Sequence, residues 1–272
     1  MMDIYFHIGL HKTGSTWLQK HLFSNLEYFN LLNDYVRPWE DPIIKKLVLS
    51  DLESFDVIEF SKLINSKYKK NKINIISSER LSGHPISKGF DSELIAQKIY
   101  KSFPNAKIII VTRETKSFIS SSYKQIVKQG YPGSFQSYIN GTSWFFPVSS
   151  SKYFKHENIV NKYLNLFSPN NVLELKFENF KENKDEFLSH ISNFIKLKID
   201  VKENQKNHNV NKTFSNSRIR SIRFLNNFRK SDYAKRTNLS IFYNSFSIFS
   251  LSKKAIFIIS LIISAFFSNK KF

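Results

Sequence analysis

The sequence predicts an α/β fold in which helices flank both faces of a central parallel sheet, as a three-layer sandwich. Short, almost continuously apolar runs alternate with longer segments of helical periodicity along most of the chain. This alternation is typical of parallel sheets that are buried on both faces. The chain has 272 residues, of which 41% are hydrophobic, so it is large enough to bury such a core.

Four runs rich in β-branched and aromatic residues are expected to form the strands, because these side chains favour pleated, buried segments. They are Ile4–Ile8, Lys72–Ser77, Lys107–Thr112 and Val172–Phe177. The helical patterns between and after them are Ser15–Phe29, Val57–Lys69, Ser92–Phe103, Ser117–Lys128, Glu157–Phe167 and Lys184–Ile195. Pro104 and Pro169 end two of these helices, because proline cannot continue a helix. Prolines and glycines predict irregular structure near residue 40 and over residues 130–153.

The loop between the first strand and the first helix contains groups that bind a phosphate. It reads Gly9-Leu10-His11-Lys12-Thr13-Gly14-Ser15-Thr16-Trp17-Leu18. Free N–H groups at a helix start, together with the helix dipole, favour an anion there. Lys12 adds a full positive charge, and Ser15 and Thr16 add hydroxyl donors. A helix-capping role for the two hydroxyls is compatible with phosphate binding.

This loop differs from the ATP-binding loop of P-loop kinases. Gly9 and Gly14 have the spacing of that motif, but Ser15 occupies the position where the motif needs lysine. Such enzymes also need an acidic residue after a second apolar strand to hold magnesium. Here the strand Lys107–Thr112 is followed by Arg113. A P-loop kinase or other nucleotide-dependent phosphotransferase is therefore the alternative interpretation, and no metal site is expected.

The loop instead resembles the 5′-phosphosulfate-binding loop of sulfotransferases that use PAPS (3′-phosphoadenosine 5′-phosphosulfate). In that family Lys-Thr/Ser-Gly-Ser/Thr-Thr follows a strand, and the matching run here begins at Lys12. The resemblance implies a P-loop-type fold and a catalytic lysine that contacts the bridging oxygen. The cofactor-binding residues that it implies in this loop are Lys12, Thr13, Gly14, Ser15, Thr16 and Trp17.

A second motif of the same family lies later in the chain. Its members carry an arginine at a strand end and a serine eight residues on, which hold the 3′-phosphate, and Arg113 and Ser121 have this spacing. The planar fork of arginine suits the task because it grips phosphate oxygens in pairs. An ion pair between Arg113 and Glu114 is the structural alternative. A looser match, Asn171–Phe180, resembles the strand and following helix that many members place after the cofactor site.

The departures from the family pattern favour a bacterial, carbohydrate-type branch. Many relatives have Asn-Pro after the arginine and an acid at the fourth position, where this chain has the residues Glu114–Ser117. The late glycine-rich loop of cytosolic sulfotransferases is not found in the sequence. Asn209–Ser215 resembles the polar segment that bacterial members have at that place.

Two residues after the second strand are candidates for the general base that takes the proton from an acceptor hydroxyl. Glu79 comes just past the strand end, where ligands bind in such sheets, and resembles the glutamate base of some carbohydrate sulfotransferases. His84 is the second candidate, because cytosolic members use a histidine. The structural alternative for Glu79 is a salt bridge with Arg80 or a nearby lysine. His7 is expected in the core. His11 is expected in solvent, and a contact with the acceptor or the cofactor is its alternative.

The charge of the chain bounds its partners. A net charge of +19 suits an anionic cofactor, an acidic glycan or an anionic membrane surface. Nucleic acid is not expected, because no zinc-ligand set, RNP-like aromatic strand or helix-turn-helix signature accompanies the charge. A non-enzymatic basic protein that binds nucleic acid or membrane is the second alternative interpretation. The chain has no cysteine, which fits a reducing compartment.

The C-terminal region differs in composition from the rest. Residues 1–235 are expected to form the sulfotransferase domain and residues 236–272 a basic, apolar extension. Within the extension, Ala255–Phe267 is apolar on nearly every face. As a helix it would be about 20 Å long, short of the roughly 30 Å hydrocarbon core of a membrane. It is expected either to be buried in the protein or to lie on a membrane surface.

The motifs together predict a PAPS-dependent sulfotransferase that moves a sulfuryl group to an acceptor hydroxyl and releases PAP. The acceptor is expected to be a carbohydrate, such as a bacterial surface glycan or its lipid-linked precursor. No N-terminal signal or anchor is expected, because the first strand begins almost at once. We therefore predict a cytoplasmic protein, which is peripheral on the inner face of the membrane if the apolar segment lies on a membrane surface and not in the core. The sequence leaves the oligomeric state unknown.

Deleting residues 253–272 tests the interpretation of the apolar segment. If it lies on a membrane, the full chain should co-sediment with anionic vesicles, and the truncated protein should be soluble and active but should no longer bind them. The four flanking lysines contribute about 1 kcal/mol each on an anionic surface. If the full chain does not bind vesicles and the truncated protein aggregates, the segment is part of the core.

Overall fold

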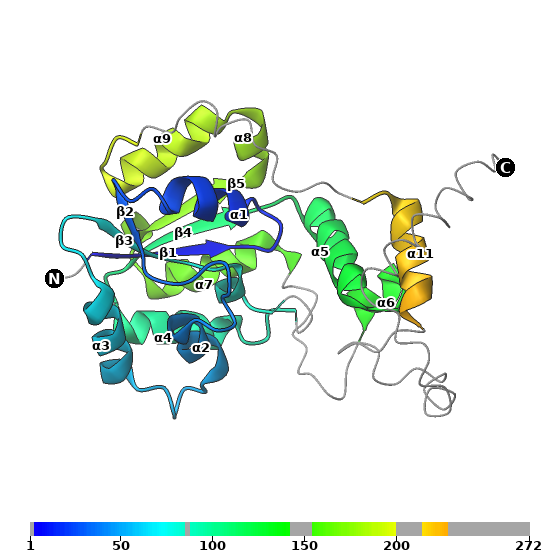
Figure 1. Cartoon of the computed structure of the whole chain (residues 1–272), viewed down its shortest axis with the longest axis horizontal. Helices are drawn as coiled ribbons and strands as arrows, with labels where there is room; N and C mark the ends of the chain where they lie inside the picture. Colours follow the sequence, from blue (N-terminus) through cyan, green and yellow to red (C-terminus); the bar gives the residue numbers. More distant parts are fainter. Residues whose placement is uncertain (1–2, 85–87, 142–153, 200–213, 228–272) are drawn as a thin grey trace. The chain divides into compact units, whose positions relative to one another are not determined.

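The computed structural model describes residues 3–84, 88–141, 154–199 and 214–227 (Figure 1). The chain forms two compact units, each of which is described by itself. The first comprises Met1–Phe118 and Ser143–Val210, and the second Ile119–Thr142 and Asn211–Phe272. The division falls within one helix, α5, whose first turn belongs to the first unit.

A five-stranded sheet in the order β2-β3-β1-β4-β5 forms the centre of the first unit, and all of its strand pairs are parallel. The strands are β1 (Ile4–Gly9), β2 (Phe29–Leu31), β3 (Ile73–Ser77), β4 (Lys107–Thr112) and β5 (Val172–Lys176). In the register, His7 lies beside Ser77 of β3, and Gly9 lies beside Val111 of β4. The predicted parallel α/β sheet is confirmed.

The helices alternate with the strands along the chain. In the first unit they are α1 (Ser15–Trp17), which continues as a π-helical segment (Leu18–Phe23), then α2 (Pro42–Leu49), α3 (Val57–Lys67), α4 (Ser92–Ser102), α7 (His156–Leu166), α8 (Phe177–Glu182) and α9 (Lys184–Ile195). Two short 3₁₀ helices, Glu79–Ser82 and Pro169–Asn171, follow β3 and precede β5. The helix α5 (Thr115–Gln129) begins in the first unit and ends in the second.

Helices cover both faces of the sheet, because alternate residues of each central strand point to opposite sides. On one face, Tyr5, Ile75 and Ile109 pack against the helical segment after β1 and against α9. On the other, Phe6 and Phe103 have ring centroids 6.2 Å apart. Figure 1 shows α2, α3, α4 and α7 on the side opposite α8 and α9. The three-layer arrangement therefore follows from central strands that are buried at almost every position and so need cover on both faces.

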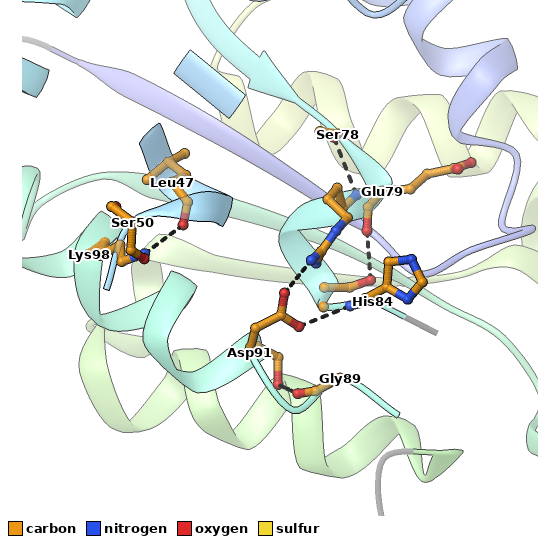
Figure 2. A network of polar contacts seen from close by, with 12 residues as sticks. Leu47, Ser50, Ser78, Glu79, His84, Gly89, Asp91 and Lys98 are labelled. Atoms are coloured by element: carbon orange, nitrogen blue, oxygen red, sulfur yellow. Dashed lines mark hydrogen bonds and ion pairs between the residues drawn. The ribbon is translucent and has the colours of Figure 1, made fainter. Parts of the chain in front are cut away.

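A buried lysine joins two helices on the second face. Lys98 of α4 is 1% exposed, and its Nζ donates to the carbonyl oxygen of Leu47 at 2.9 Å and to that of Ser50 (Figure 2). These carbonyls lie at and just after the C-terminus of α2, where helical carbonyls lack intrahelical partners and a cation is favourable. Lys98 thus acts as a cap for α2 and has a structural role.

The second unit contains the rest of α5 with α6 (Phe135–Asn140) and α11 (Asn216–Asn226). Aromatic rings link the first two helices, since Tyr123 and Tyr138 have centroids 5.9 Å apart. The side chain of Asn226 in α11 donates to the carbonyl oxygens of Val127 and Tyr131 at 2.7 and 3.1 Å. The connection after α5 is therefore held by both a ring cluster and a buried amide.

Several elements differ from the sequence prediction, and the helices α8 and α11 were not predicted. The helix expected at Ser15–Phe29 ends at Phe23, because Phe29 begins the edge strand β2. The stretch expected to be irregular contains α2, which Asp41 caps by accepting from the N–H of Ile44 at 3.0 Å. The expected loop after α5 contains α6, whose cap is Ser134.

The predictions for the C-terminal region concern residues that lie outside the described ranges. They include the boundary at residue 235, most of the polar segment 209–215 and the apolar run 255–267. Among the described residues, no helix has the length and apolar character needed to cross a membrane. Membrane attachment and localisation thus stay predictions.

Candidate functional site

The site lies where four neighbouring parallel strands end at the same edge of the sheet. The phosphate loop, which we define as residues 10–14, follows β1, Glu79 follows β3, Arg113 follows β4, and Phe177 follows β5. Because β1 lies between β3 and β4, the loop is placed between the segments that carry Glu79 and Arg113. Ligands of open parallel sheets bind at this edge.

Two left-handed residues shape the phosphate loop. Lys12 has φ 68° and Gly14 has φ 82°. For a lysine, this conformation costs roughly 1–2 kcal/mol, so the surrounding contacts must hold it. The hydroxyl of Thr13, which is buried, donates to the Leu10 carbonyl at 2.6 Å, and the Leu10 N–H donates to the Val111 carbonyl at 3.2 Å. The loop is thereby closed on itself and tied to β4.

Neither glycine of the motif has room for a side chain, because neighbouring atoms lie too close to the position that a Cβ would take. A Cβ on Gly14 would lie 3.0 Å from the ring of Phe177, in addition to its positive φ. A Cβ on Gly9 would lie 2.2 Å from Ser15 Oγ and 3.2 Å from the His7 ring. Ser15 is 1% exposed, and its Oγ has no hydrogen-bond partner within the described part of the chain. The loop thus packs against aromatic rings while leaving one buried hydroxyl unsatisfied.

The remaining residues of the motif differ in accessibility. Thr16 is exposed, and Lys12 is partly exposed, so both can reach a ligand. Trp17 is 3% exposed and packs on Phe180 with ring centroids 5.1 Å apart. Trp17 is therefore part of the core, and its predicted cofactor contact stays a prediction.

Arg113 connects three elements at the end of β4. Its Nη1 donates to the Lys12 carbonyl at 2.7 Å, and its Nε donates to Ser117 Oγ at 2.8 Å. The guanidinium carbon lies 5.1 Å from the centre of the Phe177 ring, which is within cation–π distance. The two sequence motifs therefore meet through a direct contact that their spacing did not predict.

Glu114 caps the helix that follows it, and does not form the ion pair with Arg113 that was the structural alternative to phosphate binding. Its carboxylate accepts from the N–H groups of Lys116 and Ser117 at 3.2 and 2.9 Å, which caps the N-terminus of α5. The acidic residue at this departure from the family pattern thus stabilises the helix that begins beside the site. Ser121 lies later in α5, in the second unit, and its predicted role stays a prediction.

Glu79 pairs with the phosphate loop instead of with Arg80. Its Oε2 lies 3.6 Å from Nδ1 of His11, and the two side chains are 34% and 19% exposed. The other ring nitrogen of His11 lies 3.4 Å from the carbonyl oxygen of Gly83. The expectation that His11 faces solvent is wrong, because the loop after β1 packs against the segment after β3.

The surroundings of Glu79 favour its charged form. Burial raises the pKa of the carboxyl, but the hydrogen bond and charge of His11, followed by the charges of Lys12 and His7, lower it. The net result is a pKa below the ordinary value of glutamate. Glu79 is therefore a carboxylate at neutral pH, next to the catalytic lysine candidate.

His84 lies five residues after Glu79, and Figure 2 shows both side chains on the segment that follows β3. Burial, with the positive charges of Arg80 and His11, lowers the pKa of His84 to about 4. The His84 N–H donates to Asp91 Oδ1 at 3.0 Å, and the other oxygen of Asp91 pairs with Arg80. His84 is thus a neutral imidazole at neutral pH, on a segment held by Asp91.

A buried polar cluster lies beneath the loop. His7 is fully buried, as predicted, and its Nδ1 is 2.7 Å from Ser77 Oγ. Burial lowers the pKa of His7 to about 4, although Glu79 acts in the opposite direction. The side-chain amides of Gln19 and Asn33 both donate to the Ser77 carbonyl at 3.1 Å. This cluster holds the end of β3, one residue before the turn that carries Glu79.

Sequence reasoning missed three residues of the site. Phe177 supports both Gly14 and Arg113, His156 accepts from the Arg113 N–H at 3.3 Å, and His11 pairs with Glu79. Only His11 carried a signal, since it adjoins Lys12. Within the described ranges, no group of three or more His, Asp or Glu side chains has the arrangement of a metal site.

Comparison with known proteins identifies the family. The model of the sulfotransferase domain matches residues 4–245. Comparison with curated sequences gave no match. A sulfotransferase from Alicyclobacillus acidocaldarius is similar in structure, with a TM-score of 0.50 and 16% identity over 75% of this chain and 88% of that one. This likeness supports the fold alone.

Two other solved structures are more distant. The sulfotransferase domain from the curacin biosynthetic pathway has a TM-score of 0.46 and 12% identity over 99% of both chains. Mouse sulfotransferase SULT7A1, solved with PAP, has a TM-score of 0.40 and 16% identity over 75% of this chain and 60% of that one. Because the family model spans nearly the whole chain, the protein belongs to the sulfotransferase family, the PAPS-dependent enzymes that its two motifs indicated.

Proposed function

We propose that this sulfotransferase transfers a sulfuryl group from PAPS to a hydroxyl group of a carbohydrate acceptor. The observation that carries the proposal is the position of Lys12, whose loop contacts Glu79 through His11 and Arg113 through a main-chain carbonyl. One edge of the sheet thus combines a cation for the donor, a candidate base and a second phosphate-binding cation.

The residues of the loop fit the donor. Ser15 has a buried hydroxyl with no hydrogen-bond partner among the described residues. The first N–H groups of a helix lack intrahelical partners, and Lys12 supplies charge. When bound, PAPS supplies the sulfuryl group together with a phosphate leaving group. Lys12 stabilises the negative charge that develops as the bond to that phosphate breaks, which is electrostatic catalysis by a preorganised cation.

A base beside the lysine supports a hydroxyl acceptor. Glu79 is deprotonated at neutral pH because its pKa is lowered, so it can take the proton that the acceptor oxygen loses. Its position just past β3 resembles that of the glutamate base of carbohydrate sulfotransferases, and this is the support for a glycan acceptor. His84, neutral and on the same segment, is the other candidate base.

Calorimetry separates this proposal from the phosphotransferase alternative. We expect PAP to bind in the absence of magnesium, and ATP to bind more weakly whether or not magnesium is present. Magnesium-dependent ATP binding that is tighter than PAP binding would contradict the proposal. Salt-sensitive binding of any polyanion, without selectivity for PAP, would favour a non-enzymatic basic protein.

Lys12→Ala is expected to abolish sulfate transfer while leaving the fold intact. The side chain is partly exposed and its loss removes charge from the leaving-group site without opening a core cavity. Turnover with PAPS, measured together with thermal unfolding, checks this. Activity equal to that of the wild type would remove Lys12 from the mechanism.

Arg113→Ala should weaken the binding of PAP far more than the binding of AMP, which lacks the 3′-phosphate. A charge-assisted contact contributes about 1.5–3 kcal/mol, so the expected loss is roughly ten- to a hundredfold in PAP affinity. Ser121→Ala should act in the same direction with a smaller loss, since only a neutral hydroxyl is removed. Equal losses for both nucleotides would reject the 3′-phosphate assignment.

Glu79→Gln preserves shape and removes basicity. If Glu79 is the base, kcat should fall by about 10²–10⁴ with PAP affinity nearly unchanged, whereas His84→Ala should retain turnover. The reverse result assigns the base to His84. Because the pKa of either group is lowered, wild-type kcat should persist through mildly acidic pH and fall only as the base becomes protonated at lower pH.

A further inference from the structure

We propose that Arg113 is also a positioning residue, which holds the main chain of the phosphate loop so that Lys12 points correctly during sulfuryl transfer. This inference rests on the proposed function, because it deepens the role of one residue of the same site. It assigns Arg113 an effect on the rate of transfer, separate from its effect on donor affinity.

The contact with the loop is made to the main chain at the catalytic position itself. Arg113 Nη1 donates to the carbonyl oxygen of Lys12 at 2.7 Å. Lys12 is the non-glycine residue of this loop in the left-handed region, with φ 68°. Such a conformation persists only where the surroundings determine it. A charged donor on the carbonyl is well suited to hold the peptide that follows Lys12 Cα, and hence the direction in which the side chain leaves the loop.

The guanidinium is itself held on two further sides. Its Nε donates to Ser117 Oγ at 2.8 Å, and its plane lies near the Phe177 ring, 5.1 Å from the ring centre. Phe177 also lies against Gly14, where a Cβ would approach its ring to 3.0 Å. One aromatic ring therefore contacts both the arginine and the loop. We call this set of contacts, which Arg113 makes with Lys12, Ser117 and Phe177, the bracket.

The bracket leaves donors for a phosphate. Arginine has five N–H groups, and the contacts with Ser117 and Lys12 use one on Nε and one on Nη1. Within the described ranges, three N–H groups remain, on Nη1 and Nη2, and can bind phosphate oxygens. Holding the loop and binding the 3′-phosphate are thus simultaneous tasks of one side chain, and lysine cannot perform both because it lacks the planar fork.

The two roles predict different kinetics. If Arg113 only binds the 3′-phosphate, its replacement raises the KM for PAPS, and saturating PAPS restores kcat. If it also positions Lys12, kcat stays low at saturating PAPS. The loss of a contact that matters only in the transition state lowers kcat, whereas the loss of uniform binding raises KM.

The experiment compares Arg113→Lys and Ser117→Ala with Lys116→Ala, an exposed charge on the same turn that serves as the control. Steady-state kinetics at saturating PAPS are combined with hydrogen exchange of residues 10–17 in the nucleotide-free protein. We expect kcat to fall about tenfold or more in Arg113→Lys, as a lost charge-assisted hydrogen bond implies. Ser117→Ala should show a smaller decrease, with PAP affinity within a few-fold of wild type, and Lys116→Ala should show none.

Hydrogen exchange makes the test independent of the reaction. Amides of residues 10–17 should exchange faster in Arg113→Lys than in the wild type and the Lys116→Ala control, with thermal unfolding of all variants measured in parallel. Unchanged exchange overturns the proposal, and so does faster exchange with wild-type kcat at saturating PAPS. Failure of the wild type to bind PAP or transfer sulfate would instead overturn the proposed function, while the exchange result would still report on the bracket.

Discussion

The arrangement of the site depends on the parallel pairing of β1 between β3 and β4. This strand is buried along its whole length, so its register is fixed by packing on both faces. Parallel strands end at the same edge, and the loop that leaves β1 must therefore pass between the segments that follow its neighbours. Lys12, Glu79 and Arg113 meet because three buried strands pair, although the residues are far apart in sequence.

The loop is held from both sides by polar contacts of different kinds. Toward β3, His11 pairs with Glu79, and toward β4, Arg113 donates to the Lys12 carbonyl. The first contact lies between partly exposed side chains and influences the pKa of Glu79. The second acts on the main chain, where it opposes the strain of a left-handed lysine. His11 thus influences the charge of Glu79, whereas Arg113 holds the backbone of Lys12.

Sequence patterns predicted well the elements whose formation depends mainly on their own residues. The strands at β1, β3, β4 and β5 were found within a residue of their bounds, because short runs rich in β-branched and aromatic residues favour buried strands. The short elements β2, α2, α6 and α8 were missed, since three to eight residues carry little periodicity and depend on caps such as Asp41. The eleven-residue helix α11 was missed as well. The ion pair between Arg113 and Glu114, which was the structural alternative to phosphate binding, is not formed among the described residues, because the helix N-terminus beside Glu114 competes for its carboxylate.

The sequence by itself determined the family, the parallel α/β fold and the identity of the phosphate loop, because alternating apolar and helical segments, and glycine, lysine and hydroxyl residues at fixed spacing, are local patterns along the chain. Only the tertiary structure decided that His11 faces Glu79 and that Arg113 holds the Lys12 carbonyl. These contacts join residues 68 and 101 positions apart in the chain. No local pattern encodes them, because they arise only when strand order and register bring the loop ends together.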